Sequence, residues 1–339
     1  PYFNLDGVSG ASGASGTSGS AGTQGASGTA GSAGNGGTGI YVNAQGVSVV
    51  NSGAIVGGAA GGSGATQGSA VVFTSNAANS SFTVNAGSSV TGTVDSTQAA
   101  NTTLILGNGA GGQTFNTSLI GASATYRGFS NFQATGADKN TTTYTLTGSS
   151  TQATAWSVNN ATLSVASDAA LGATNSGLTL NDARLQATAS LNTSRTIGLT
   201  GQSELTAGTG VALTLGGVMS GSGALTLSGG GNFSLTRANT FTGALNIAGG
   251  QLTMGSGATL ATRTISIGAG SALSTAGGAL ASNAHVTNAG SFTLSGNEAI
   301  GDVNSTGNVY LNGGSNLTLL SGGFNSVISG TLNGSGGLT

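Results

Sequence analysis

Pairs of apolar residues separated by one small polar residue return about every 20 positions in the second half of the chain. The clearest series is Leu225 and Leu227, Leu245 and Ile247, and Ile265 and Ile267. A second series lies upstream, at Leu163 and Val165, Leu178 and Leu180, and Ile197 and Leu199. Alternation with a period of two is typical of a strand with one buried face, and a repeat of this length indicates stacked supersecondary units. The sequence therefore predicts an all-β, parallel β-solenoid with about 20 residues per turn and roughly 15 turns over residues 40–339.

The composition fits such a coil. The chain of 339 residues has 65 glycines, one proline and only 4% charged residues. Glycine can supply the positive φ angles of tight corners, whereas proline would remove a donor from the strand ladder. Stacked Asn, Ser and Thr side chains can hydrogen-bond to one another, while stacked like charges would repel. With 37% hydrophobic residues, the chain has enough apolar surface for a narrow core and is predicted to fold.

Charge and composition exclude several classes of function. A net charge of −2 with six basic residues argues against nucleic-acid binding, which needs a basic patch. No window approaches the roughly 18 apolar residues of a membrane-spanning helix. The absence of cysteine suits a secreted protein without disulfides. No metal or other cofactor is predicted, because no glycine run carries the aspartate of calcium-binding nonapeptide repeats.

Residues 1–39 form a separate low-complexity segment, in which every third residue from Gly7 to Gly37 is glycine. The pattern is that of collagen, but a collagen triple helix also needs abundant proline, which this segment lacks. Three interpretations remain: a flexible solvated leader, an extended strand of the polyproline-II type lying against the solenoid and, third, a true triple helix. A dinucleotide-binding pattern at Gly34, Gly36 and Gly39 is attributed to chance, because neither a strand precedes it nor a helix follows it.

Three short stretches of the second half carry a family resemblance. They are residues 221–229 (GSGALTLSG), 238–243 (ANTFTG) and 247–254 (IAGGQLTM). Together they resemble the autotransporter-associated β-strand repeat, with Phe241 in place of the usual Tyr and Gln251 in place of a common Thr. Weaker similarity extends over about residues 40–339, including residues 126–132 (YRGFSNF).

This resemblance implies a right-handed parallel β-helix, the passenger of a type V secretion system in Gram-negative bacteria. It implies that residues 40–339 are truncated at their C-terminal end and that a membrane β-barrel lies beyond them. Such passengers are displayed extracellularly at the outer membrane, and many act as virulence-associated adhesins in adhesion, self-association or biofilm formation. Expected partners are therefore a second copy of the chain, a host surface, extracellular matrix or a glycan. The family motif is structural, so it assigns no binding residue here.

Catalytic residues are scarce, and the chain is predicted not to be an enzyme. His285 is the only histidine, and its alternating context predicts a surface or corner position rather than a catalytic base. The Gly-Asp-Ser opening of lipase-type passengers is broken by Val303 in the sequence that begins at Gly301. Most acidic residues are scattered, although Asp168, Asp182 and Arg184 could lie together on neighbouring turns. A structural ion pair is the preferred interpretation of those three residues.

One local group of aromatic residues departs from the small-residue texture. It contains Tyr126, Phe129, Phe132, Tyr144 and Trp156. The group is interpreted either as packed core or, functionally, as an exposed patch that stacks on sugars or a partner. A predicted polar protrusion at residues 137–140, with Asp138 and Lys139, would border such a patch. These seven residues are the candidate binding site.

Two alternative functions stay open beside the adhesin. Many solenoids cleave polysaccharides with clustered acids, so a carbohydrate-active lyase or hydrolase is one alternative. An ice-binding solenoid is the other, although its regular Thr-x-Thr arrays are not evident here, where such pairs are irregular.

Overall fold

The predicted β-solenoid is confirmed. The computed structural model describes residues 2–5, 33–108, 111–320 and 325–339. Nearly all secondary structure there is parallel β-strand, stacked as a solenoid of about 12 turns that lie about 22 residues apart. The turns are thus slightly longer and fewer than predicted. The described part contains no α-helix, only the short 3-10 helices η1 (Thr117–Leu119) and η2 (Asp168–Leu171).

The chain divides into two compact units, which are described separately. The first unit comprises residues 1–108 and 118–133, and the second comprises residues 109–117 and 134–339. Residues 6–32, which hold most of the glycine-triplet segment, lie outside the described residues. The described part of the segment begins at Ala33.

In the first unit, parallel strands form three stacks. The stacks, in hydrogen-bonding order, are β1 (Tyr2–Leu5), β3 (Ser48–Asn51), β6 (Ser81–Asn85) and β9 (Thr103–Gly107); β2 (Ile40–Val42), β5 (Val71–Phe73), β8 (Val94–Asp95) and β11 (Tyr126–Arg127); and β4 (Ala54–Val56) and β7 (Ser89–Thr91). β12 (Asn131–Thr135) spans the division between the units.

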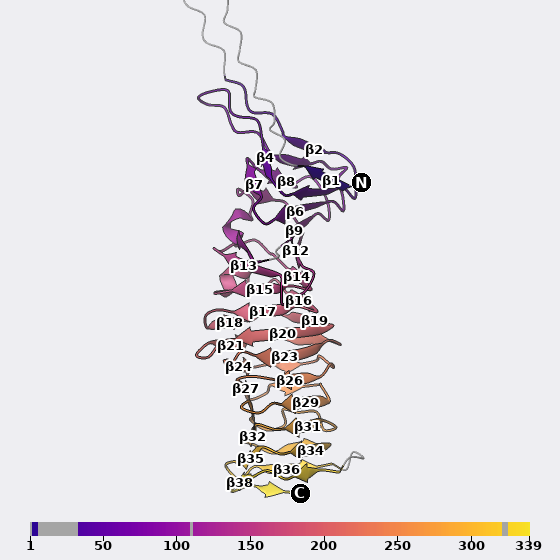
Figure 1. The fold of residues 1–339 in the computed structure, drawn as a ribbon, viewed down its shortest axis with the longest axis vertical. Helices are drawn as coiled ribbons and strands as arrows, with labels where there is room; N and C mark the ends of the chain where they lie inside the picture. The colour runs from indigo at the N-terminus through magenta and orange to yellow at the C-terminus, as the bar shows by residue number, and fades with distance from the viewer. Residues whose placement is uncertain (1, 6–32, 109–110, 321–324) are drawn as a thin grey trace, which may run out of the picture. The chain divides into compact units, whose positions relative to one another are not determined.

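The second unit contains the longest stack, the long sheet, which runs through the magenta to yellow part of Figure 1. Its strands are β10 (Gln113–Asn116), β13 (Thr143–Thr147), β15 (Thr162–Val165), β17 (Arg184–Ala187), β20 (Gln202–Ala207), β23 (Ala224–Ser228), β26 (Leu245–Ile247), β29 (Thr264–Ile267), β31 (His285–Asn288), β34 (Asp302–Ser305) and β37 (Val327–Ile328).

Other stacks of the second unit complete each turn. One, the neutral sheet, consists of β18 (Leu191–Thr193), β21 (Ala212–Leu215), β24 (Asn232–Leu235), β27 (Gln251–Met254), β30 (Ala272–Thr275), β32 (Ser291–Leu294), β35 (Asn308–Leu311) and β38 (Leu332–Gly334). The rest are β14 (Trp156–Asn159), β16 (Leu178–Asn181), β19 (Ile197–Thr200) and β22 (Met219–Gly221); β25 (Ala238–Asn239) and β28 (Thr259–Leu260); and β33 (Glu298–Ile300), β36 (Asn316–Leu319) and β39 (Gly337–Leu338).

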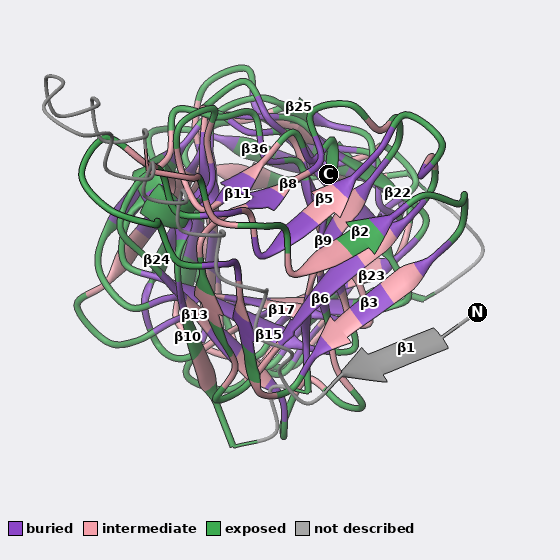
Figure 2. Cartoon of the chain, turned by 90° about the horizontal axis from the view of Figure 1, so that it is seen from above, coloured by how far each residue is buried: buried purple, intermediate pink, exposed green. Residues whose placement is uncertain are grey.

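The apolar repeat seen in the sequence is the register of the long sheet. Leu225 of β23 pairs with Leu245 of β26, which pairs with Ile265 of β29. All three side chains are buried, and the residues between them on each strand face outward. The same alternation of buried and less buried positions is visible in Figure 2 along β3 of the first unit. Similar apolar residues, Leu and Ile, therefore stack on one another, which is why the period is conspicuous in the sequence.

Corners between strands use residues that tolerate positive φ, as predicted. Asn160, Asp182 and Gly201 occupy equivalent corners of successive turns, with φ angles of 49°, 49° and 60°. Just before them, the side chain of Asn181 donates to Asn159 Oδ1 at 3.3 Å, and Thr200 Oγ1 donates to Asn181 Oδ1 at 3.1 Å. Left-handed backbone favours Gly, Asn and Asp, so the corners account for part of the unusual composition.

Candidate functional site

The predicted aromatic patch is not a surface feature. Relative exposures are 5% for Tyr126, 6% for Phe129, 1% for Phe132, 0% for Tyr144 and 1% for Trp156. Side chains this deeply buried cannot stack on a sugar or a partner without unfolding, so the exposed-patch hypothesis is wrong. The alternative interpretation, packed core, is correct for all five.

Aromatic pairs fill the first unit. The ring of Phe129 packs edge-on against Phe73, with centroids 6.0 Å apart and an interplanar angle of 74°. Tyr126 packs against Phe82 at 6.0 Å, and burial raises the pKa of Tyr126 to about 12. In the second unit, the Tyr144 hydroxyl donates to the carbonyl of Thr135 at 2.7 Å. These contacts stabilise the core and leave no ring face for binding.

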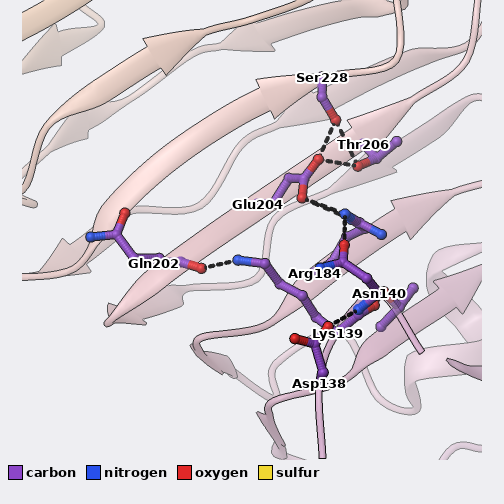
Figure 3. A network of polar contacts seen from close by, with 9 residues as sticks. Asp138, Lys139, Asn140, Arg184, Gln202, Glu204, Thr206 and Ser228 are labelled. Carbon is purple, nitrogen blue, oxygen red and sulfur yellow. Dashed lines mark hydrogen bonds and ion pairs between the residues drawn. The ribbon is translucent and has the colours of Figure 1, made fainter. Parts of the chain in front are cut away.

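The two polar members of the predicted site, Asp138 and Lys139, lie in a turn that is tied to the long sheet rather than projecting freely. The Lys139 ammonium group donates to the carbonyl oxygen of Gln202 on β20, and the Lys139 carbonyl accepts from Thr162 Oγ1 at 2.6 Å. Asp138 Oδ1 accepts the backbone N–H of Asn140 at 2.6 Å. Figure 3 shows the turn lying along neighbouring strands. The predicted protrusion is therefore a strap.

A second group of charges on the outward side of the long sheet continues this network. Arg184 on β17 pairs in register with Glu204 on β20, and its Nε lies 2.8 Å from Glu204 Oε2. Arg184 Nη2 also donates to Asn140 Oδ1 at 2.9 Å, and Ser228 Oγ donates to Glu204 Oε1 at 2.5 Å (Figure 3). Burial alone would raise the pKa of Glu204, but the hydrogen bonds from Ser228 and Arg184 and the charge of Arg184 outweigh it and lower the pKa.

The predicted grouping of Asp168, Asp182 and Arg184 is wrong in its partners. Asp168, at the start of η2, pairs with Arg195, whose Nε lies 2.8 Å from Asp168 Oδ1 and whose side chain is 2% exposed. Arg195 also donates to the carbonyl oxygens of Gly172 at 2.6 Å and Ala173 at 2.7 Å. Asp182 accepts the N–H of Gln202 at 2.7 Å. The ion pair predicted among these three residues is therefore not formed: Asp168 and Arg184 each pair with another residue, Arg195 and Glu204, and Asp182 accepts a backbone N–H.

His285 is partly exposed, with a side chain that is 33% accessible, and has a partner that the sequence did not predict. On β31 it pairs in register with Asp302 of β34, and His285 Nδ1 contacts Asp302 Oδ1. Its Nε2 lies 3.4 Å from the hydroxyl of Thr287, so carboxylate, imidazole and hydroxyl follow one another as in a hydrolase. Catalysis would also need donors for an oxyanion. The backbone around Thr287 is instead paired with strands on both sides, β29 and β34.

The neutral sheet presents a different surface. None of its eight described strands contains a charged residue. One outward residue per strand stands in register with the next. This column, the neutral face, consists of Asn192, Thr214, Ser234, Thr253, Ser274 and Thr293, followed by Tyr310 and Asn333. Neighbouring rows of a parallel sheet lie about 4.8 Å apart. The arrangement is a regular array of neutral groups, all of them small except Tyr310, that can donate and accept hydrogen bonds.

The described residues contain no group of three or more His, Cys, Asp or Glu side chains arranged to hold a metal ion. Among the same residues, no helix is long and apolar enough to cross a membrane. A scan of protein-family models, a search of curated proteins and a search of solved structures each found no match to this chain.

Proposed function

We propose that this chain is a non-enzymatic surface adhesin that associates with other copies of itself through the sides of its solenoid. The observation that carries the proposal is the neutral sheet, whose eight described strands have no charged residue. A protein surface normally bears many charges. A long column without them places no like charges opposite one another when two copies meet.

The neutral face is complementary to itself. Ser, Thr and Tyr hydroxyls both donate and accept hydrogen bonds, and Asn carries both kinds of group. Two such columns can therefore pair in several registers. Each contact contributes little, but repetition along the stacked turns converts weak contacts into tight association, because every contact after the first is made within one complex.

The proposed setting is the one implied by the autotransporter resemblance: an extracellular passenger displayed at the outer membrane of a Gram-negative bacterium, acting in auto-aggregation or biofilm formation. A glycan, extracellular matrix or another host surface is the alternative partner for the same face. Ice binding is less well supported, because the column beside the hydroxyls is mixed, with Ala212, Asn232 and Gln251 in successive rows.

Carbohydrate cleavage also has less support. It requires a protonated acid close to a second, ionised carboxylate. Glu204 is held ionised by its partners, and its bonds to Arg184 and Ser228 occupy both oxygens. The outward side of the long sheet therefore has no free acid at this cluster.

Self-association can be tested with microbeads that carry the purified chain. We expect beads to clump, and clumping to persist at high salt, since neutral contacts are not screened as ion pairs are. Beads coated with bovine serum albumin are the control. Beads that stay dispersed at every coating density would refute self-association, and clumping abolished by salt would refute neutral contacts as its cause.

A further inference from the structure

The glycine-triplet motif has a described end, residues 33–39, which belongs to the first unit and is not part of any strand. Two other segments of the same unit lie against it, the glycine-rich residues 57–61 between β4 and β5 and residues 66–70, which contain Gly68, just before β5. These three segments, 34–39, 57–61 and 66–70, are called the glycine clamp. None of them contains a charged residue.

Backbone hydrogen bonds join the three segments in a ring. Segment 34–39 donates to segment 66–70, from Gly36 to Thr66 and from Gly39 to Ser69, both at 3.0 Å. Segment 66–70 donates to segment 57–61, from Gly68 to Gly58 at 2.9 Å. Segment 57–61 closes the ring by donating back to 34–39. Its two bonds run from Gly58 to Gly37 at 2.7 Å and from Gly61 to Gly34 at 2.9 Å.

Within the ring the donors lie three residues apart, at Gly36 and Gly39 and again at Gly58 and Gly61, while the Gly57 N–H donates outside the ring to the Thr91 carbonyl at 2.9 Å. A β-strand would donate to one neighbour at every second residue, whereas an extended helix of the polyproline-II type has three residues per turn. Segment 57–61 runs opposite to segment 34–39, because its higher-numbered donor pairs with the lower-numbered acceptor. The clamp therefore has the bonding period of collagen with mixed strand directions.

No side chain fits on the inner side of the clamp. A Cβ on Gly36 would lie 1.7 Å from the carbonyl oxygen of Gly58, one on Gly57 would lie 2.0 Å from that of Gly68, and one on Gly68 would lie 2.1 Å from that of Gly37. Each clash is with backbone, which cannot move aside without breaking the ring. By contrast, Thr38 and Ala60 are exposed, and their N–H groups take part in none of these bonds.

We infer that residues 57–61 and 66–70 form a binding site for an extended strand with glycine at every third position, and that residues 34–39 occupy this site. The site leaves no room for a side chain at Gly36 or Gly39, and it contacts one side chain of the strand, because the Thr66 N–H donates to Asn35 Oδ1 at 2.9 Å. The two glycines that the site requires, Gly36 and Gly39, lie three residues apart but are out of phase with the triplet series, which ends in Gly34 and Gly37. The inference is independent of the proposed self-association, because it involves no part of the neutral face.

Amide hydrogen exchange followed by NMR tests the inference in the intact chain. We expect protection at Gly36, Gly39, Gly58, Gly61 and Gly68, and exchange at the rate of an unstructured peptide at Gly37, Thr38, Ala59 and Ala60. A period of three in the protection is the diagnostic result. Uniform fast exchange across residues 34–39, or protection with a period of two, would overturn the inference.

Two substitutions in the occupying strand sharpen the test. Gly36→Ala places a methyl group against the Gly58 carbonyl, so protection at Gly39 and Gly61 should fall by at least about tenfold. The matched control Thr38→Ala should leave it unchanged. Thr38→Pro should also be tolerated, because proline adopts the extended conformation and removes only an unused donor. Loss of protection in Thr38→Pro, or its survival in Gly36→Ala, would contradict the proposed site, whatever the overall stability of either variant.

Discussion

Both compact units stack parallel strands in register, but the number of residues per turn is more regular in the second unit than in the first. In the second unit, residues paired between successive strands of the long sheet from β23 to β31 are 20 or 21 positions apart, as from Leu225 to Leu245 and from Ile265 to Val286. In the first unit the separation is 22 positions from Phe82 to Leu104 but 33 from Val49 to Phe82. The same ladder thus tolerates turns of very different length.

The extra residues of the first unit lie outside its strands. Between β4 and β5 they form two segments of the glycine clamp, and large aromatic pairs such as Phe73 and Phe129 fill the core. The regular part of the second unit uses stacked Leu and Ile instead. The comparison shows that the number of residues per turn depends on the length of the segments between strands. The strands themselves keep their register and their buried side chains in both units.

The largest expected effect is in the aromatic core. Phe82→Ala should lower the free energy of unfolding of the first unit by about 3–5 kcal/mol, the usual cost of emptying a buried phenylalanine site. Hydrogen exchange should show the loss at β3, β6 and β9, while amides of β23 to β31 remain protected. Leu245→Ala in the second unit is the matched test, with the reverse pattern expected. Equal losses in both units from either change would show that they unfold as one.

The buried ion pair of the second unit comes next. Arg195→Ala leaves Asp168 without its guanidinium partner and should destabilise the second unit by about 3 kcal/mol, the low end of what breaking a buried pair costs. Urea unfolding measures the loss. The double variant Asp168→Asn and Arg195→Met, which removes both charges, should recover part of it. If the single variant were as stable as the unaltered chain, the pair would not hold η2 and its loop.

A smaller effect is expected at the corners. Gly201 and Gly210 both have positive φ, 60° and 81°, so replacement by alanine costs about 1 kcal/mol at each. Only at Gly201 would the new Cβ also meet a neighbour, 2.4 Å from Asp182 Oδ1, whereas nothing lies within 4 Å at Gly210. Thermal unfolding should therefore rank Gly201→Ala below Gly210→Ala. The opposite order would contradict the stacked-corner account.

The smallest effects concern pH. The folded-state pKa of Glu204 is lowered, so its contribution to stability is present above its unfolded pKa of about 4.3 and is lost as pH falls through the folded value. Burial raises the pKa of Glu298, so its contribution is full below the unfolded pKa and is lost as pH rises through the folded value. The free energy of unfolding, measured from pH 3 to 8, should fall less steeply with decreasing pH in Glu204→Gln than in the unaltered chain. In Glu298→Gln, the fall in the free energy of unfolding that Glu298 causes as pH rises should disappear.

How much the sequence could predict follows from the same contrast. The solenoid was predictable from the pairs at residues 225–267, because stacked apolar residues repeat there with almost constant spacing. The first unit was not, since its unequal turns erase the period. Arg184 and Glu204 were predictable in principle, being opposite charges 20 positions apart at equivalent strand positions. The partner of Asp168 was not, because Arg195 follows a strand in an irregular segment whose course depends on tertiary packing.

Burial of the aromatic group was likewise beyond the sequence. Aromatic side chains suit both a core and a binding surface, and alternation in a strand gives two faces without saying which one is inside. The neutral sheet escaped notice for a related reason: its outward Ser and Thr residues become a column only once the register of its strands is known.

Sedimentation velocity of two double variants tests the central claim, that the neutral face drives self-association. Thr253→Glu with Ser274→Glu places adjacent charges on the neutral face, whereas Asn246→Glu with Ser266→Glu places them on the outward side of the long sheet. Both take the net charge from −2 to −4. We expect only the first to sediment as a monomer at concentrations where the unaltered chain associates. Equal association of both variants, or loss of association in the second alone, would contradict the claim.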